Sequence, residues 1–146
     1  MDKITIERLK AAGWHKNRKI DISVFCNKYS NIGMKMPLNI SNFLEEFGML
    51  TINAPDKRYF DVQFNPLIAI GTNLFCDYFK ECLLEYGIKE MVYPIGVARE
   101  NNLLILMTQN DVVYCFMDGC VLEVGTCVEE MLDCLVGECK MPRFIY

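Results

Sequence analysis

The sequence has few of the residues that most enzymes use for catalysis. His15 is the only histidine among 146 residues, so a Cys–His or Ser–His nucleophile would have to use it. The chain contains no glycine-rich phosphate-binding loop, no His-x-x-x-His pair and no Gly-x-Ser-x-Gly elbow. We therefore predict no catalytic residues. A thiol-dependent enzyme that uses His15 is kept as a third hypothesis, after the two that are given at the end of this section.

Long apolar runs are also missing. The longest uninterrupted apolar stretch is too short to cross a bilayer. Residues 1–8 carry several charges and no apolar core of the kind found in a secretory signal. From these absences we expect a cytoplasmic protein that makes no contact with membranes.

The eight cysteines allow two interpretations. An even number could form a disulfide framework. However, five of them lie inside predicted strands or helices, which favours small buried hydrophobic residues in a reducing compartment. No Cys-x-x-Cys occurs, and the cysteines of the C-terminal half are five to seven residues apart. We therefore predict neither a metal site nor a cofactor.

Charge is distributed unevenly along the chain. Residues 1–60 contain ten Lys/Arg and six Asp/Glu, whereas residues 61–146 contain five and thirteen, so the second part carries a formal charge of −8. An acidic surface repels nucleic acid and accelerates encounter with a basic partner. The alternative is a surface that is charged only for solubility.

The one concentration of positive charge is the short segment 15–19, which follows Trp14. Aromatic and basic residues together can bind nucleic acid, but one short loop on an acidic protein is weak support for that function. We predict no direct nucleic-acid binding and expect Trp14 to pack beneath the first helix.

The C-terminal half is predicted to form most of the sheet. Short runs rich in β-branched and aromatic residues, typical of successive antiparallel strands, occupy residues 91–97, 103–107, 112–116 and 120–124. Asp118-Gly119 separates the last two runs and predicts a hairpin closed by a type I′ turn. The periodicity then becomes helical, with an apolar face formed by Val128, Met131, Leu132 and Leu135. Thr126 and Glu129 have the spacing of a capping box, and Gly137 can end the helix.

The N-terminal half is predicted to be mainly helical. The expected helices are 4–12, a second from Asp21 or Ser23 to Asn31, a third from Pro37 to Gly48, and a long fourth at 73–86. The apolar side chains of the fourth helix are expected to face inward; they are Leu74, Phe75, Tyr78, Phe79, Cys82, Leu83 and Tyr86. Residues 49–53 and 58–64 read as two strands joined by a turn at 54–57. The whole chain, 1–146, is thus predicted to be one α+β domain in which a mostly meander antiparallel sheet of about six strands is flanked by about five helices.

An ordered set of short motifs resembles a known family. The motifs are Ala12-Gly13-Trp14, Arg18-Lys19-Ile20-Asp21, Phe43-Leu44-Glu45-Glu46-Phe47-Gly48-Met49-Leu50, Phe64-Asn65-Pro66 with Ala69, Tyr93-Pro94-Ile95-Gly96, Val113-Tyr114 and the helix that ends at Gly137. Together they resemble the third subfamily of the SUKH superfamily. In two places the chain departs from the family pattern. Met49 replaces a frequent second glycine, and Phe75 or Phe79 stands near an expected tryptophan; we interpret both as core substitutions.

The resemblance implies an α+β fold and a function in immunity. Many bacterial members are small cytosolic immunity proteins that bind and neutralise polymorphic or contact-dependent toxins, often nucleases or deaminases. Combined with the acidic C-terminal half, this predicts a stoichiometric inhibitor whose partner-binding candidates lie on turns and strand edges. These candidates are Glu100, Asp111, Asp118 and Glu123. The alternative is a SUKH-like regulatory or scaffold module that binds proteins without a toxin partner.

Overall fold

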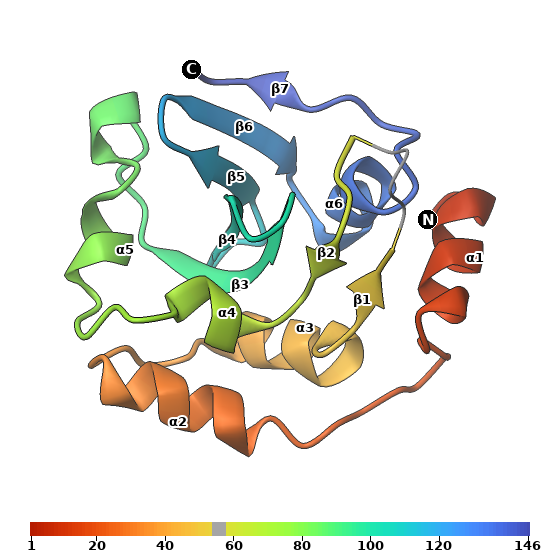
Figure 1. The fold of residues 1–146 in the computed structure, drawn as a ribbon, viewed down its shortest axis with the longest axis horizontal. Helices are drawn as coiled ribbons and strands as arrows, with labels where there is room; N and C mark the ends of the chain where they lie inside the picture. The colour runs from red at the N-terminus through yellow and green to blue at the C-terminus, as the bar shows by residue number, and fades with distance from the viewer. Residues whose placement is uncertain (54–57) are drawn as a thin grey trace.

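The fold is built on one twisted antiparallel sheet whose strands follow one another in chain order (Figure 1). The computed structural model describes residues 1–53 and 58–146. The strands are β1 (Thr51–Ile52), β2 (Val62–Gln63), β3 (Val92–Ala98), β4 (Leu103–Thr108), β5 (Val113–Met117), β6 (Cys120–Gly125) and β7 (Arg143–Phe144). The predicted α+β meander is confirmed. The described residues contain one strand more than expected, because the C-terminal tail pairs with β6.

Helices surround this sheet (Figure 1). They are α1 (Lys3–Ala11), α2 (Ser23–Asn31), α3 (Leu38–Phe47), α4 (Pro66–Ile70), α5 (Asp77–Glu81), the 3-10 helix η1 (Leu84–Tyr86) and α6 (Val128–Leu135). α6 packs on β6, whereas α3, α4 and α5 contact β3. Figure 1 shows α5 on one side of the sheet and α1 and α6 toward the other. None of the described helices combines the length and the hydropathy that crossing a membrane requires.

The first two strands are shorter than predicted. β1 and β2 contain two residues each, and the expected turn at 54–57 lies outside the described residues. Met49 and Asp61 have positive φ values of 67° and 56°, and an extended strand requires negative φ. These two residues therefore mark where the extended conformation cannot continue.

The same measurement corrects the interpretation of the two family departures. Met49 is 55% exposed, so it is not a core residue. Its left-handed backbone conformation explains why glycine suits this position, since glycine adopts positive φ at little cost. Phe79 is buried and Phe75 is 69% exposed, so only Phe79 is a core residue.

Two local details differ from the predictions around the final hairpin and helix. Met117 pairs with Cys120, as the expected hairpin requires. However, the turn is not type I′, because Gly119 has positive φ and Asp118 does not. At the start of α6, Thr126 donates from its amide and its hydroxyl to Glu130, each at 3.0 Å. The acidic partner of Thr126 is therefore Glu130 rather than Glu129.

The prediction of a long fourth helix at 73–86 is wrong. The segment forms α5 and η1 instead, and α4 precedes them. One reason is that the amide of Cys76 donates to the carbonyl of Ile32 at the end of α2, at 2.9 Å, rather than to a preceding helical turn. The predicted inward face also fails, because Leu74 and Phe75 are exposed.

The basic segment near the N-terminus is partly structural. The ring of Trp14 stacks on Phe47 of α3 with centroids 6.3 Å apart, and its Nε1 donates to Glu46. Its ring partner therefore belongs to α3, whereas we expected packing beneath the first helix. Arg18 donates to the carbonyls of Glu46 and Gly48 at 2.6 and 2.9 Å, so this guanidinium joins the segment to the end of α3.

All eight cysteines are free thiols. Three are buried, as predicted for all of them: Cys76, Cys115 and Cys134. Cys127 and Cys139 are exposed, because they lie just outside the ends of α6. The prediction of buried cysteines is therefore confirmed for these three and wrong for Cys127 and Cys139.

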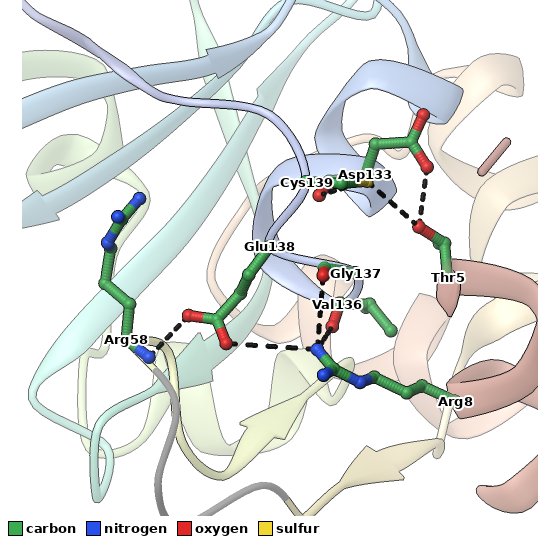
Figure 2. A network of polar contacts seen from close by, with 8 residues as sticks. All are labelled: Thr5, Arg8, Arg58, Asp133, Val136, Gly137, Glu138 and Cys139. Carbon is green, nitrogen blue, oxygen red and sulfur yellow. Dashed lines mark hydrogen bonds and ion pairs between the residues drawn. The ribbon is translucent and has the colours of Figure 1, made fainter. Parts of the chain in front are cut away.

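A polar network joins α1 to α6 and to the residues that follow α6 (Figure 2). The hydroxyl of Thr5, which is fully buried, donates to Asp133 of α6 at 2.6 Å. The amide of Asp2 donates to the same carboxylate at 2.9 Å. Burial tends to raise the pKa of Asp133, but these hydrogen bonds and the nearby N-terminus hold the pKa below its usual value.

Arg8, one turn after Thr5 on the same face of α1, completes this network. Its guanidinium donates to the carbonyls of Val136 and Gly137 at 2.8 and 3.2 Å, and it lies 3.9 Å from the carboxylate of Glu138. Glu138 also accepts from the backbone amide of Arg58 (Figure 2). We call these contacts the α1–α6 network, and in it the polar groups of both helices are paired within the molecule.

Candidate functional site

The four predicted partner-binding residues do not form one surface. Glu100 lies in the β3–β4 turn and Asp118 in the β5–β6 turn, and both are exposed. Alternate turns of a meander lie at the same end of the sheet. The fold therefore brings Glu100 and Asp118 to one end.

The other two predicted residues lie elsewhere and are already paired. Asp111 follows β4 at the opposite end and accepts from Asn39 at 2.8 Å. It borders a hollow of about 360 Å³ between α3 and α6. Glu123, in β6, forms an ion pair with Arg143 of β7 at 2.7 Å. Both carboxylates therefore already have a partner within the molecule.

Beside Asp118 lies a hollow with a volume of about 860 Å³. It is bounded by α4, α5 and η1 on one side and by the β3–β4 and β5–β6 turns on the other. The lining residues are Ala69, Asn73, Tyr78, Glu81, Cys82, Leu84, Glu85, Asn101, Asn102, Leu104, Phe116, Met117 and Asp118. We call this hollow the α5 groove.

The sheet register explains why the groove has an apolar floor. Leu104 of β4 pairs with Phe116 of β5, so both side chains lie on the same face. On β5, Cys115 points to the other face and is fully buried, whereas Phe116 keeps 8% of its surface exposed. The short helices α5 and η1 therefore cover this face less completely than the core covers the opposite one.

Three carboxylates line the groove: Glu81, Glu85 and Asp118. No lysine, arginine or histidine is among the lining residues, and the ion pairs found between described residues include none of these three carboxylates. Burial, followed by the nearby Cys82 and Asp118, raises the pKa of Tyr78. Within residues 1–53 and 58–146, the groove is therefore a region of negative charge that no cation pairs with.

Four exposed apolar side chains lie in the groove or in the chain segment that borders it. Leu84 and Tyr78 line it and are 47% and 42% exposed, and Leu74 and Phe75, in the segment between Asn73 and Tyr78, are 73% and 69% exposed. We call these four side chains the apolar rim. Clustered exposed apolar residues bordered by charge are typical of surfaces that bind other macromolecules.

Aromatic contacts hold the outer wall in place. The ring of Tyr86 in η1 lies 5.9 Å from that of Phe116 in β5 and 5.0 Å from that of Tyr146. Offset and tilted aromatic pairs of this kind stabilise their arrangement beyond the area that they bury. The wall made by η1 is thus fixed to both the sheet and the C-terminal tail.

The groove is suited to binding rather than to nucleophilic catalysis. Burial raises the pKa of its one thiol, Cys82, to about 11, and reactive cysteines require a lowered pKa. His15 does not line the groove; it is exposed, and its Nδ1 donates to the carbonyl of Lys16 at 2.9 Å. Among the described residues, no group of three or more His, Cys, Asp or Glu side chains could hold a metal ion.

Sequence reasoning found Asp118 and missed Glu81, Glu85 and the apolar rim. The missed residues fall in the segment predicted to be one amphipathic helix with its apolar side chains inward. A signal was present, because Asn65-Pro66 is a favourable helix start: Asn65 accepts from the amide of Leu67 at 3.0 Å and Pro66 opens α4. This signal indicates α4 but does not show that residues 73–86 divide into α5 and η1.

Comparison with known proteins agrees with the fold. A family model described as SUKH-3 immunity protein matches residues 1–138, which include β1 to β6, α1 to α6 and the whole α5 groove. No curated protein and no solved structure matches the chain. The resemblance predicted from the short motifs is confirmed, and the chain belongs to the SUKH-3 immunity protein family.

Proposed function

We propose that this protein is a bacterial cytoplasmic immunity protein. It binds a cognate polymorphic or contact-dependent toxin and neutralises it by forming a stoichiometric complex. Its partner is a protein toxin domain, of a class that includes nucleases and deaminases. The family to which the chain belongs supports this proposal, and inhibition by occupancy requires no catalytic residues in the inhibitor.

One structural observation carries the proposal. The α5 groove combines three carboxylates without ion-pair partners among the described residues and a rim of four exposed apolar side chains. Apolar anchors surrounded by polar groups are the usual composition of a protein-binding surface. Complementary charge adds specificity and increases the association rate.

The test uses the toxin domain encoded next to the gene. Cells that express this domain should survive when they also express the immunity protein, and the purified pair should elute as a 1:1 complex with a Kd in the nanomolar range or below, about −12 kcal/mol. Failure to bind and failure to protect would both contradict the proposal. A gene without a toxin-like neighbour, whose product captures another protein, would favour the regulatory or scaffold module instead.

A further inference from the structure

We infer that the α5 groove is the surface that contacts the toxin, and that its occupant is a positively charged toxin segment in which arginine lies next to an apolar side chain. This inference rests on the proposed function and goes further, because it names one surface and the chemistry of what fills it. It follows from three features of the groove: carboxylates in no ion pair between described residues, aromatic rings and the exposed apolar rim.

The first feature is available negative charge. Glu81, Glu85 and Asp118 line the groove and have no cation within ion-pair distance among the described residues. The same end of the sheet also carries the exposed Glu100, next to the lining residue Asn101. A concave surface of one sign concentrates ligands of the opposite sign and raises their association rate.

Two other carboxylates of the molecule are already engaged. Asp133 accepts from Thr5 and Asp2 in the α1–α6 network, and Glu123 is paired with Arg143. The carboxylates of the α5 groove are in no ion pair among the described residues, and they lie together in one hollow. Charge complementarity therefore favours the groove over these two positions.

The second and third features select the kind of cation. The rings of Tyr78 and Phe116 lie in the same groove as the carboxylates. A guanidinium can stack on an aromatic face while it donates to a carboxylate, and arginine does both better than lysine. Leu74 and Phe75 on the rim offer exposed apolar area for a neighbouring apolar residue of the same segment. The side-chain amides of Asn73, Asn101 and Asn102 supply further hydrogen-bonding groups along the lining.

The charge is tested with a groove variant and a control that lose the same charge. The groove variant is Glu81→Gln, Glu85→Gln and Asp118→Asn. The control is Glu7→Gln, Glu90→Gln and Glu129→Gln, three exposed carboxylates outside the groove lining. With the toxin domain encoded next to the gene as the probe, the groove variant should bind on the order of 10- to 100-fold more weakly, mainly through slower association. The control should stay within about threefold of the unmodified protein.

The apolar contribution is tested in the same way. Leu74→Ser with Phe75→Ser removes two rim side chains, and Val24→Ser with Leu38→Ser removes two exposed apolar side chains, on α2 and α3, that do not line the groove. The rim variant should bind at least about tenfold more weakly, mainly through faster dissociation. The control should bind like the unmodified protein, and circular dichroism should show that all four variants are folded.

The possible results separate the two proposals. Loss of binding confined to the groove variants supports the assignment. If the groove variants and their controls bind equally well, the groove is not the interface, although the immunity function stands. If raising the salt concentration from 0.05 to 0.5 M leaves the affinity of the unmodified protein unchanged, the occupant is not a cationic segment. If the unmodified protein does not bind the toxin domain, the proposed function fails and the groove assignment fails with it.

Discussion

The α1–α6 network and the α5 groove both contain carboxylates, but these groups differ in whether they have partners within the molecule. In the network, Asp133 and Glu138 are held by hydrogen bonds and an ion pair from α1 and from Arg58 (Figure 2). In the groove, Glu81 and Glu85 face open space with no cation paired to them in the described part of the chain. The two regions lie on different sides of the same sheet (Figure 1).

This difference separates residues that stabilise the fold from residues that are free to bind. A buried or half-buried polar group that loses its partner destabilises the protein, so changes in the network should lower stability. An exposed group without a partner contributes little to stability, so changes in the groove should affect binding alone. The following predictions test this division, from the largest expected effect to the smallest.

The largest effect is expected for Gly137→Ala at the edge of the network. An added Cβ would collide with the hydroxyl of Thr5 and lie 3.1 Å from the sulfur of Cys139. We expect this overpacking to lower the free energy of unfolding by about 3 kcal/mol. Urea denaturation measures it, with Gly33→Ala as the control: its Cβ would meet nothing within 4 Å, so only its positive φ should cost stability, about 1 kcal/mol. Equal losses would show that α1 and α6 are not tightly joined.

A smaller loss is expected for Thr5→Val, which keeps the shape of the side chain and removes its hydroxyl. The hydroxyl donates to Asp133 at 2.6 Å, and a hydrogen bond to a charged group is worth about 1.5–3 kcal/mol. We expect a loss of about 2 kcal/mol at pH 7. An unchanged free energy of unfolding would mean that this hydrogen bond does not stabilise the fold.

The same variant should also change how stability depends on pH. The pKa of Asp133 is lower in the folded state than its ordinary value of 3.8, so its contribution is present above that value and is lost as the pH falls through the folded pKa. The stability difference between the unmodified protein and Thr5→Val should therefore shrink as the pH is lowered below about 4. A difference that does not change with pH would assign the effect of Thr5 to packing.

Met49→Gly tests a position that belongs to neither region. Met49 is 55% exposed and has a φ of 67°, so its backbone is strained while its side chain packs little. Glycine relieves this strain but adds entropy to the unfolded chain. We expect a net gain of about 0.5 kcal/mol in the free energy of unfolding. A loss would show that the side chain of Met49 packs more than its exposure indicates.

The smallest effect is expected in the groove. Leu74→Ser with Phe75→Ser should change the free energy of unfolding by less than about 0.5 kcal/mol, because both side chains are largely exposed. Urea denaturation of this variant, measured beside Gly137→Ala, compares the two regions directly. A loss comparable to that of Thr5→Val would remove the division between them.

Where the apolar pattern of a segment was clear, the sequence predicted the fold well. The four strands from β3 to β6, the α3 helix between Pro37 and Gly48, and α6 with its buried Met131 and Leu132 are all present. The strands β3 to β5 are buried along almost their whole length, whereas α3 and α6 bury one face. In both cases the apolar pattern follows directly from the packing.

The groove could not be predicted in this way. The segment around Leu74 and Phe75 has apolar side chains that point to solvent, and its backbone bonds to Ile32 of α2, a contact between residues far apart in sequence. An apolar residue that binds a partner looks the same in sequence as one that fills the core. Among the acidic residues predicted to bind a partner, Asp118 is exposed on a tight turn, whereas Glu123 on β6 meets Arg143, a pairing that the sequence did not reveal.

The contacts among the tilted rings of Phe116, Tyr86 and Tyr146 have a further consequence for how fast a complex forms. They hold η1 in one position before any partner arrives, so association does not have to order a loop first. A toxin segment should therefore meet a preorganised receptor, and encounter should proceed as rigid-body docking at a rate set by diffusion and charge. Removing the ring of Tyr86 would leave η1 less ordered before binding, so that each association event would also have to order it.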